Sequence, residues 1–135
     1  MLELFTSALA PSVVPLFVYG TLRPHGVLST PWLGESVVDH QPAIARGFGL
    51  YAPSPAWFPF LVHETGQVAQ GDVLWVKRGP ELMRTALMEI NVGYTMELVD
   101  VELDNLHEPL QVAAFVWRGG TENMHPVPHN DWYAT

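Results

Sequence analysis

One stretch of this chain has the pattern of a long amphipathic helix. Residues 80–91 begin with a proline, which suits the first turn of a helix, and Gly93 follows them. Their apolar residues fall within about 140° of a helical wheel drawn at about 100° per residue, so we expect the helix to lie against a sheet. These apolar residues are Leu82, Met83, Ala86, Leu87 and Ile90.

The remaining patterned segments are short and have the residue types of β-strands. We predict strands over residues 16–19, 43–51, 60–63, 68–77, 95–103 and 110–117. Gly47 and Gly49 predict a bulge or a close backbone approach in the second strand, and residues 64–67 predict a hairpin turn between the third and the fourth. A short helical turn is expected around residues 30–33. Twelve prolines and eleven glycines agree with many turns between short strands.

Length, charge and the absence of cysteine exclude several classes of function. The 135 residues suit one domain, for which we expect residues 14–135 after an N-terminal extension at residues 1–13. The net charge is −8 and the six basic residues are dispersed, which disfavours nucleic acid and anionic membranes as partners. No apolar run approaches the length that spans a bilayer, and the lack of cysteine excludes thiolate chemistry and fits a cytoplasmic location.

An apolar strand that ends in a glycine turn is the first candidate for a site. Beta-branched and aromatic residues lead to Tyr19, and Gly20 allows backbone angles that a residue with a Cβ resists. Successive N–H groups can then converge on an anion or a developing oxyanion. Most strands followed by glycine end in an ordinary turn, so this feature needs support from the rest of the chain.

The residues of that turn resemble the signature of a known family. Tyr19-Gly20-Thr21-Leu22-Arg23 is similar to the segment that opens the gamma-glutamylcyclotransferase-like (AIG2-like) family. Further landmarks follow in the family's order as far as residue 132, at Leu50-Tyr51, Phe58-Pro59, Gly71-Asp72-Val73 and Asp131-Trp132. The resemblance implies an α+β fold, a small, mostly antiparallel, closed or nearly closed β-barrel with one main packed helix, which the predicted order of elements fits.

The resemblance also implies a reaction and a pocket. In this family the α-amine of a gamma-glutamyl amine or peptide attacks its own γ-carbonyl, and 5-oxoproline leaves together with an amine. The ligand is a small molecule, and neither a cofactor nor a metal is implied. The substrate-binding residues implied here are Tyr19, Gly20, Thr21, Leu22, Arg23 and Tyr94.

The family's catalytic position is altered in this chain. The family helix ends in Leu-Asp-x-x-Glu-Gly-Tyr, whose glutamate is the acid/base, and residues 88–94 place Val92 at that position. Loss of a general base typically lowers a rate by about 10²- to 10⁴-fold. Glu89, which takes the aspartate position three residues earlier, is the candidate substitute, and Glu97 is a weaker one.

Three hypotheses follow from this departure. The first is an enzyme that uses a different acid, the second is a non-catalytic domain that binds a small amino-acid-like ligand, and the third is a fold whose pocket has no role. An inward-facing Glu89 or Glu97 would favour the first hypothesis. A metal site is not expected, because Pro126 and Pro128 prevent the helix that would bring His125 and His129 to one face.

Overall fold

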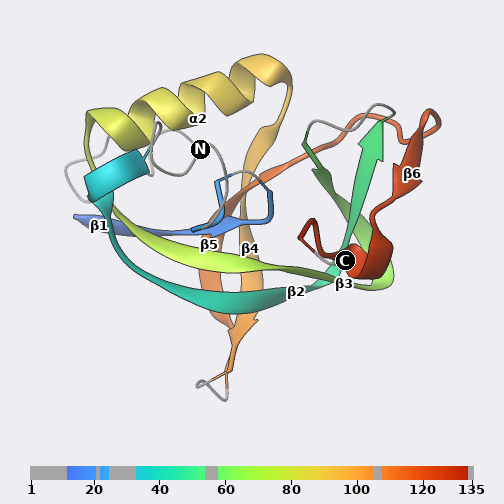
Figure 1. The fold of residues 1–135 in the computed structure, drawn as a ribbon, viewed down its shortest axis with the longest axis horizontal. Helices are drawn as coiled ribbons and strands as arrows, with labels where there is room; N and C mark the ends of the chain where they lie inside the picture. Colours follow the sequence, from blue (N-terminus) through green and yellow to red (C-terminus); the bar gives the residue numbers. More distant parts are fainter. Residues whose placement is uncertain (1–11, 21, 25–32, 54–57, 105–107, 134–135) are drawn as a thin grey trace.

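The computed structural model describes residues 12–20, 22–24, 33–53, 58–104 and 108–133. Figure 1 shows the fold. Its strands are β1 (Val13–Val18), β2 (Val37–Pro53), β3 (Phe60–Lys77), β4 (Thr95–Leu103), β5 (Leu110–Val116) and β6 (Met124–Pro126). Its helices are α2 (Pro80–Val92) and the short 3-10 helices η2 (Gly34–Ser36) and η3 (Pro128–Asn130). In these parts of the chain, no helix is both long and apolar enough to cross a membrane.

Five of the described strands close into a barrel. Around the ring β3 pairs with β1, β1 with β5, β5 with β4 and β4 with β2, and β2 then pairs with β3 again. The β1–β5 pairing is parallel and the others are antiparallel. β6 extends the sheet beside the end of β2 (Figure 1). The predicted α+β fold with a closed, mostly antiparallel barrel is therefore confirmed.

Most residues of β1 are buried. It lies between β3 and β5, and Leu16 and Phe17 are fully buried. Opposite them on β5 are Ala113 and Ala114, whose small side chains leave room for the two larger ones. The strand begins at Val13, inside the predicted extension, of which residues 1–11 lie outside the described part of the chain. Its far end brings residues 19 and 20 to the side of the barrel that α2 covers.

The hairpin predicted at residues 64–67 is wrong. These residues belong to one long strand, β3, and both halves of that strand pair with β2. The register shifts between Arg46 and Phe48, and Gly47 and Gly66 have φ angles of 83° and 88° in this region. Glycine adopts such angles without strain, so the strand pair bends there instead of ending. The predicted bulge near Gly47 is confirmed.

Helix α2 begins at Pro80, as the sequence predicts, and lies over one side of the barrel (Figure 1). Gly93 ends it with a φ of 121°, and the Gly93 N–H donates to the carbonyls of Glu89 and Ile90. That positive φ is the reason for a glycine at this position. The turn then leads directly into β4.

The buried face of α2 differs from the predicted one. Leu82, Thr85 and Ala86 are buried, whereas the side chains of Leu87 and Ile90 are 45% and 36% exposed. The predicted inward orientation of Leu87 and Ile90 is therefore wrong. The helix meets the barrel along a stripe that is rotated away from them, and the next position on this stripe, one turn after Thr85 and Ala86, belongs to Glu89.

Candidate functional site

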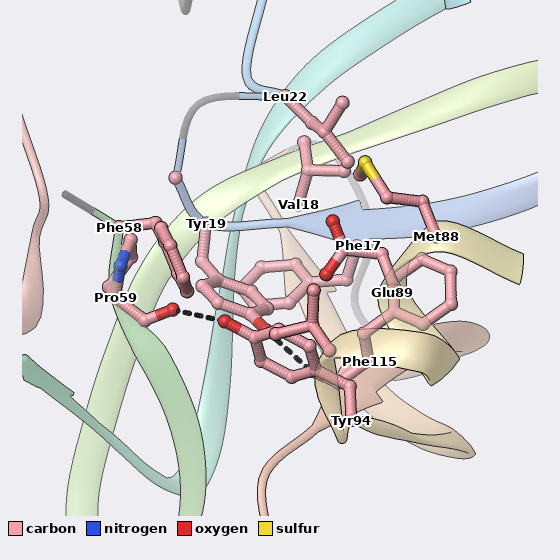
Figure 2. Close-up of a pocket in the computed structure, with 12 residues that line it drawn as sticks. Phe17, Val18, Tyr19, Leu22, Phe58, Pro59, Met88, Glu89, Tyr94 and Phe115 are labelled. Atoms are coloured by element: carbon pink, nitrogen blue, oxygen red, sulfur yellow. Dashed lines mark hydrogen bonds between the residues drawn. The ribbon is translucent and has the colours of Figure 1, made fainter. Parts of the chain in front are cut away.

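A cavity of about 140 Å³ lies between the end of β1 and the C-terminal half of α2. β5 and the residues just before β3 complete its wall (Figure 2). Most of the lining is aromatic or aliphatic, which is typical of a small-molecule site. The lining residues are Phe17, Val18, Tyr19, Gly20, Leu22, Phe58, Pro59, Met88, Glu89, Val92, Tyr94 and Phe115.

Glu89 supplies the carboxyl group of this cavity. Its side chain extends from α2 toward the other labelled lining residues (Figure 2). Burial raises the pKa of the Glu89 carboxyl from its ordinary 4.5 to about 7, because the apolar wall solvates the charged form poorly. The group therefore exists in both protonation states near neutral pH, as a general acid or base needs.

Two tyrosine hydroxyls lie in the same cavity with their protons already engaged. The Tyr19 hydroxyl donates to the carbonyl oxygen of Phe115 at 2.5 Å, and the Tyr94 hydroxyl donates to that of Pro59 at 2.8 Å. Burial, with smaller contributions that include the nearby Glu89, raises the pKa of both hydroxyls well above the usual range, so they stay neutral. The two hydroxyls also interact with each other, and the Leu61 backbone interacts with that of Tyr19, so most of their hydrogen-bonding capacity is already used within the protein.

Gly20 is required by packing and not by its backbone angle. Its φ lies outside the left-handed region that the sequence argument expects. A Cβ at this position would lie 2.8 Å from Cδ of Pro59. The turn is closed by the Arg23 N–H, which donates to the Gly20 carbonyl at 3.0 Å, and Leu22 within this turn lines the cavity.

Among the predicted binding residues that the structure describes, Arg23 is the one that does not line the cavity. Arg23 is buried beside the cavity, but its guanidinium binds two carboxylates, with Nε 2.6 Å from Asp72 Oδ2 and Nη1 2.8 Å from Asp131 Oδ1. The Arg23 guanidinium also lies 5.3 Å from the ring centre of Tyr133. Thr21 lies outside the described residues.

Glu97, the weaker candidate, lies in another part of the surface. Its carboxylate binds the exposed side chains of Arg118 and His63, and hydrogen bonds from these two groups hold its pKa below the usual range despite the opposing effect of burial. His63 Nε2 lies 2.9 Å from Glu97 Oε1. Among the residues that the structure describes, no group of three or more histidine, aspartate or glutamate side chains is placed to hold a metal ion.

The sequence that forms this barrel and cavity matches the model of one protein family. The family model described as "Gamma-glutamyl cyclotransferase, AIG2-like" matches residues 16–134. The chain belongs to this family. The match begins at β1 and includes every element that lines the cavity.

Relatives within the family are distant. The chain is 31% identical over 118 residues to "AIG2-like protein C" of Arabidopsis thaliana, a match that covers 87% of this chain and 64% of that protein. A solution structure of another Arabidopsis thaliana protein superposes with a TM-score of 0.70 at 20% identity, covering 84% of this chain and 74% of that one. A structure titled "Gamma-glutamyl cyclotransferase" superposes with a TM-score of 0.63 at 13% identity, covering 86% of this chain and 72% of that one. At these identities the two structures show a shared fold.

Val92 is part of the cavity wall. It is 46% exposed and lines the cavity near its mouth. The carboxyl group of the cavity comes from Glu89, one turn earlier on the helix. The sequence carries a signal for this, because Glu89 projects close to the buried Leu82 on a helical wheel.

The sequence did not identify several residues that line the cavity or hold Arg23. Phe17, Met88 and Phe115 line the cavity but read as ordinary core residues, and no sequence pattern separates the two roles. Asp72, the buried partner of Arg23, could have been suspected, because a buried arginine needs a carboxylate. Nothing in the local sequence identifies which acid it is.

Proposed function

We propose that this domain is a gamma-glutamyl cyclotransferase in which Glu89 is the general base. Its substrate is a gamma-glutamyl amine or peptide, and its products are 5-oxoproline and the released amine. The observation that carries the proposal is the Glu89 carboxyl inside the cavity, with a pKa raised to about 7 by burial. Family membership supplies the reaction class.

The proposed reaction needs one proton acceptor and no other reactant. The α-amine nitrogen attacks the γ-carbonyl carbon, a new C–N bond closes the five-membered ring, and the bond from that carbon to the leaving nitrogen breaks. Glu89 takes the proton that the attacking nitrogen loses and returns it to the leaving nitrogen. Holding the amine and the carbonyl of one folded substrate together supplies most of the remaining rate, because ring closure is favoured by proximity.

The groups around Glu89 suit a substrate whose α-amine faces the Glu89 carboxyl group. The ionised Glu89 favours a group that carries N–H protons, which suits the α-ammonium group of the substrate. Gly20 and Leu22 also line the cavity, and a backbone N–H group beside them suits the polarised γ-carbonyl oxygen.

A binding domain without turnover is the second candidate. The observation that favours it is Val92, which places an apolar side chain where the family's acid is expected. In that case Glu89 would hold the ligand's ammonium group without transferring its proton.

Release of 5-oxoproline from gamma-glutamyl amines and amino acids tests the proposal. We expect release by the natural protein, with kcat/KM rising as the pH passes about 7 because only the ionised Glu89 accepts a proton. Glu89→Gln should lower kcat by about 10²-fold or more. Glu81→Gln changes an exposed acid on the same helix and should have no effect.

Two results would contradict the proposal. Equal turnover by Glu89→Gln would exclude Glu89 as the base. Ligand binding without turnover by the natural protein, with turnover gained by Val92→Glu, would favour the binding domain.

A further inference from the structure

The cavity is too small for a whole gamma-glutamyl conjugate. Its volume is about 140 Å³. A cavity of about 150 Å³ holds one benzene molecule, whereas sites that enclose a drug-sized ligand have about 300 Å³ or more. The five-membered ring that forms in the reaction therefore fills the cavity, and the leaving amine lies outside its mouth.

The mouth of the cavity is apolar on the side of α2. Val92 lines the cavity from α2 and is 46% exposed, and Met88 lines it from the same helix, whereas Phe58, which is 38% exposed, lies across the cavity from Met88 (Figure 2). Large apolar side chains are rarely grouped on the surface of a monomeric protein without a binding role. Glu89 is the one carboxyl-bearing residue among the described lining residues.

A surface groove continues from this mouth along α2. Met88 and Val92 line both the cavity and the groove, and Met83 and Leu87 extend the groove along the helix. Leu87 is 45% exposed although its type favours burial. The charged residue of the groove is Arg84, which is cationic.

From this continuity, we infer that the leaving group of the substrate is an apolar amine that lies in the α2 groove. The inference rests on the proposed function. An aliphatic chain there covers Met88, Val92 and Leu87 and gains hydrophobic free energy. A leaving amine that ends in a charged group, of either sign, must dehydrate that group against these apolar side chains, and Arg84 is already engaged in an interaction of its own.

Conjugates of matched length provide the test. They are the gamma-glutamyl amides of n-hexylamine, of 1,5-diaminopentane and of 6-aminohexanoic acid, with the methylamide as a substrate too short to reach the groove. We expect kcat/KM for the hexylamide to exceed that for both charged conjugates by roughly tenfold or more. Equal kcat/KM values for the three long conjugates would overturn the inference. In that outcome, turnover of the methylamide shows that the proposed function stands.

Leu87→Ser tests whether the groove is the cause. Leu87 lies in the groove and not in the cavity, so the variant should lose most of the preference for the hexylamide and keep its rate on the methylamide. Leu98→Ser is the matched control, because Leu98 is also 45% exposed but lies on β4 and lines neither space. An unchanged preference in Leu87→Ser would overturn the inference, and the absence of release from all four conjugates would overturn the proposed function as well.

Discussion

At the scale of single residues, the Glu89 carboxyl lies in a poor environment for a negative charge. Its neighbours in the cavity are mainly aromatic and aliphatic, and its pKa is raised from 4.5 to about 7. A shift of this size corresponds to about 3 kcal/mol between the protonated and ionised forms. Ionisation of Glu89 therefore opposes folding, and the same shift gives the group the proton affinity of a neutral-pH base.

The pH dependence of stability should reveal this cost. Between pH 4.5 and 7 the folded state keeps a proton on Glu89 that the unfolded state has released, so the free energy of unfolding falls as the pH rises through this window. Glu89→Gln lacks this titration. Its free energy of unfolding should equal that of the natural protein near pH 4 and exceed it by about 3 kcal/mol near pH 8.

Urea unfolding at pH 4, 6 and 8 measures this difference. Glu81→Gln, which changes an exposed acid on α2, is the control and should show no comparable trend. A difference between Glu89→Gln and the natural protein that does not change with pH would mean that Glu89 titrates normally in the folded state.

At the scale of elements, Arg23 joins three segments that are distant in the sequence. It follows the turn at the end of β1, Asp72 belongs to β3, and Asp131 follows η3. The Arg23 and Asp72 side chains are only 11% and 7% exposed, whereas that of Asp131 is 29% exposed. Through these two ion pairs, the C-terminal segment helps to hold the turn that carries Leu22 into the cavity.

Removing the more buried carboxylate should cause the larger loss in the free energy of unfolding. Asp72→Asn should lower the free energy of unfolding by about 3–5 kcal/mol, because it leaves a buried guanidinium without its closest partner. Asp131→Asn should cost about 1–2 kcal/mol, since Arg23 keeps Asp72.

The control for these variants is an exposed ion pair. Glu102→Gln breaks the contact with Arg46, whose side chain is 64% exposed, and should cost less than about 1 kcal/mol. Thermal unfolding of the three variants would rank them. Equal losses for Asp72→Asn and Glu102→Gln would show that the Arg23 network adds no more than a surface pair.

At the scale of the whole molecule, closure of the barrel depends on a close approach of β1 and β3. A Cβ built on Gly71 would lie 2.4 Å from the carbonyl oxygen of Val18 and 2.7 Å from Cζ of Phe17. The first of these neighbours is backbone, and the second is fully buried. No flexible side chain can move to make room.

Gly71→Ala should therefore destabilise the entire barrel. Overpacking of this kind costs about 1–3 kcal/mol, and urea unfolding would measure it. Gly79→Ala is the control: its nearest neighbour would lie 3.7 Å away, and we expect a loss below about 1 kcal/mol. Similar stabilities for the two variants would mean that β1 and β3 separate at little cost.

Much of this architecture could be predicted before the structure. The proline start and glycine end of α2 and the bulge at Gly47 depend on local backbone preferences, and the structure has both. The hairpin at residues 64–67 was wrong because turn-forming residues also suit a bulge when both flanking segments find the same partner strand. Leu87 and Ile90 were misplaced because apolar periodicity locates a stripe on a helix but not the line along which the helix touches its neighbour.

By itself, the sequence determined the composition of elements and the family, since these depend on residue identity and local order. Only the tertiary structure decided that β1 pairs in parallel with β5, that Arg23 binds Asp72 and Asp131, and that the Glu89 carboxyl lies in the cavity. Each of these depends on which distant segments become neighbours. Burial then changes the chemistry, because the proton affinity of Glu89 comes from the apolar walls around it, which four separate parts of the chain supply.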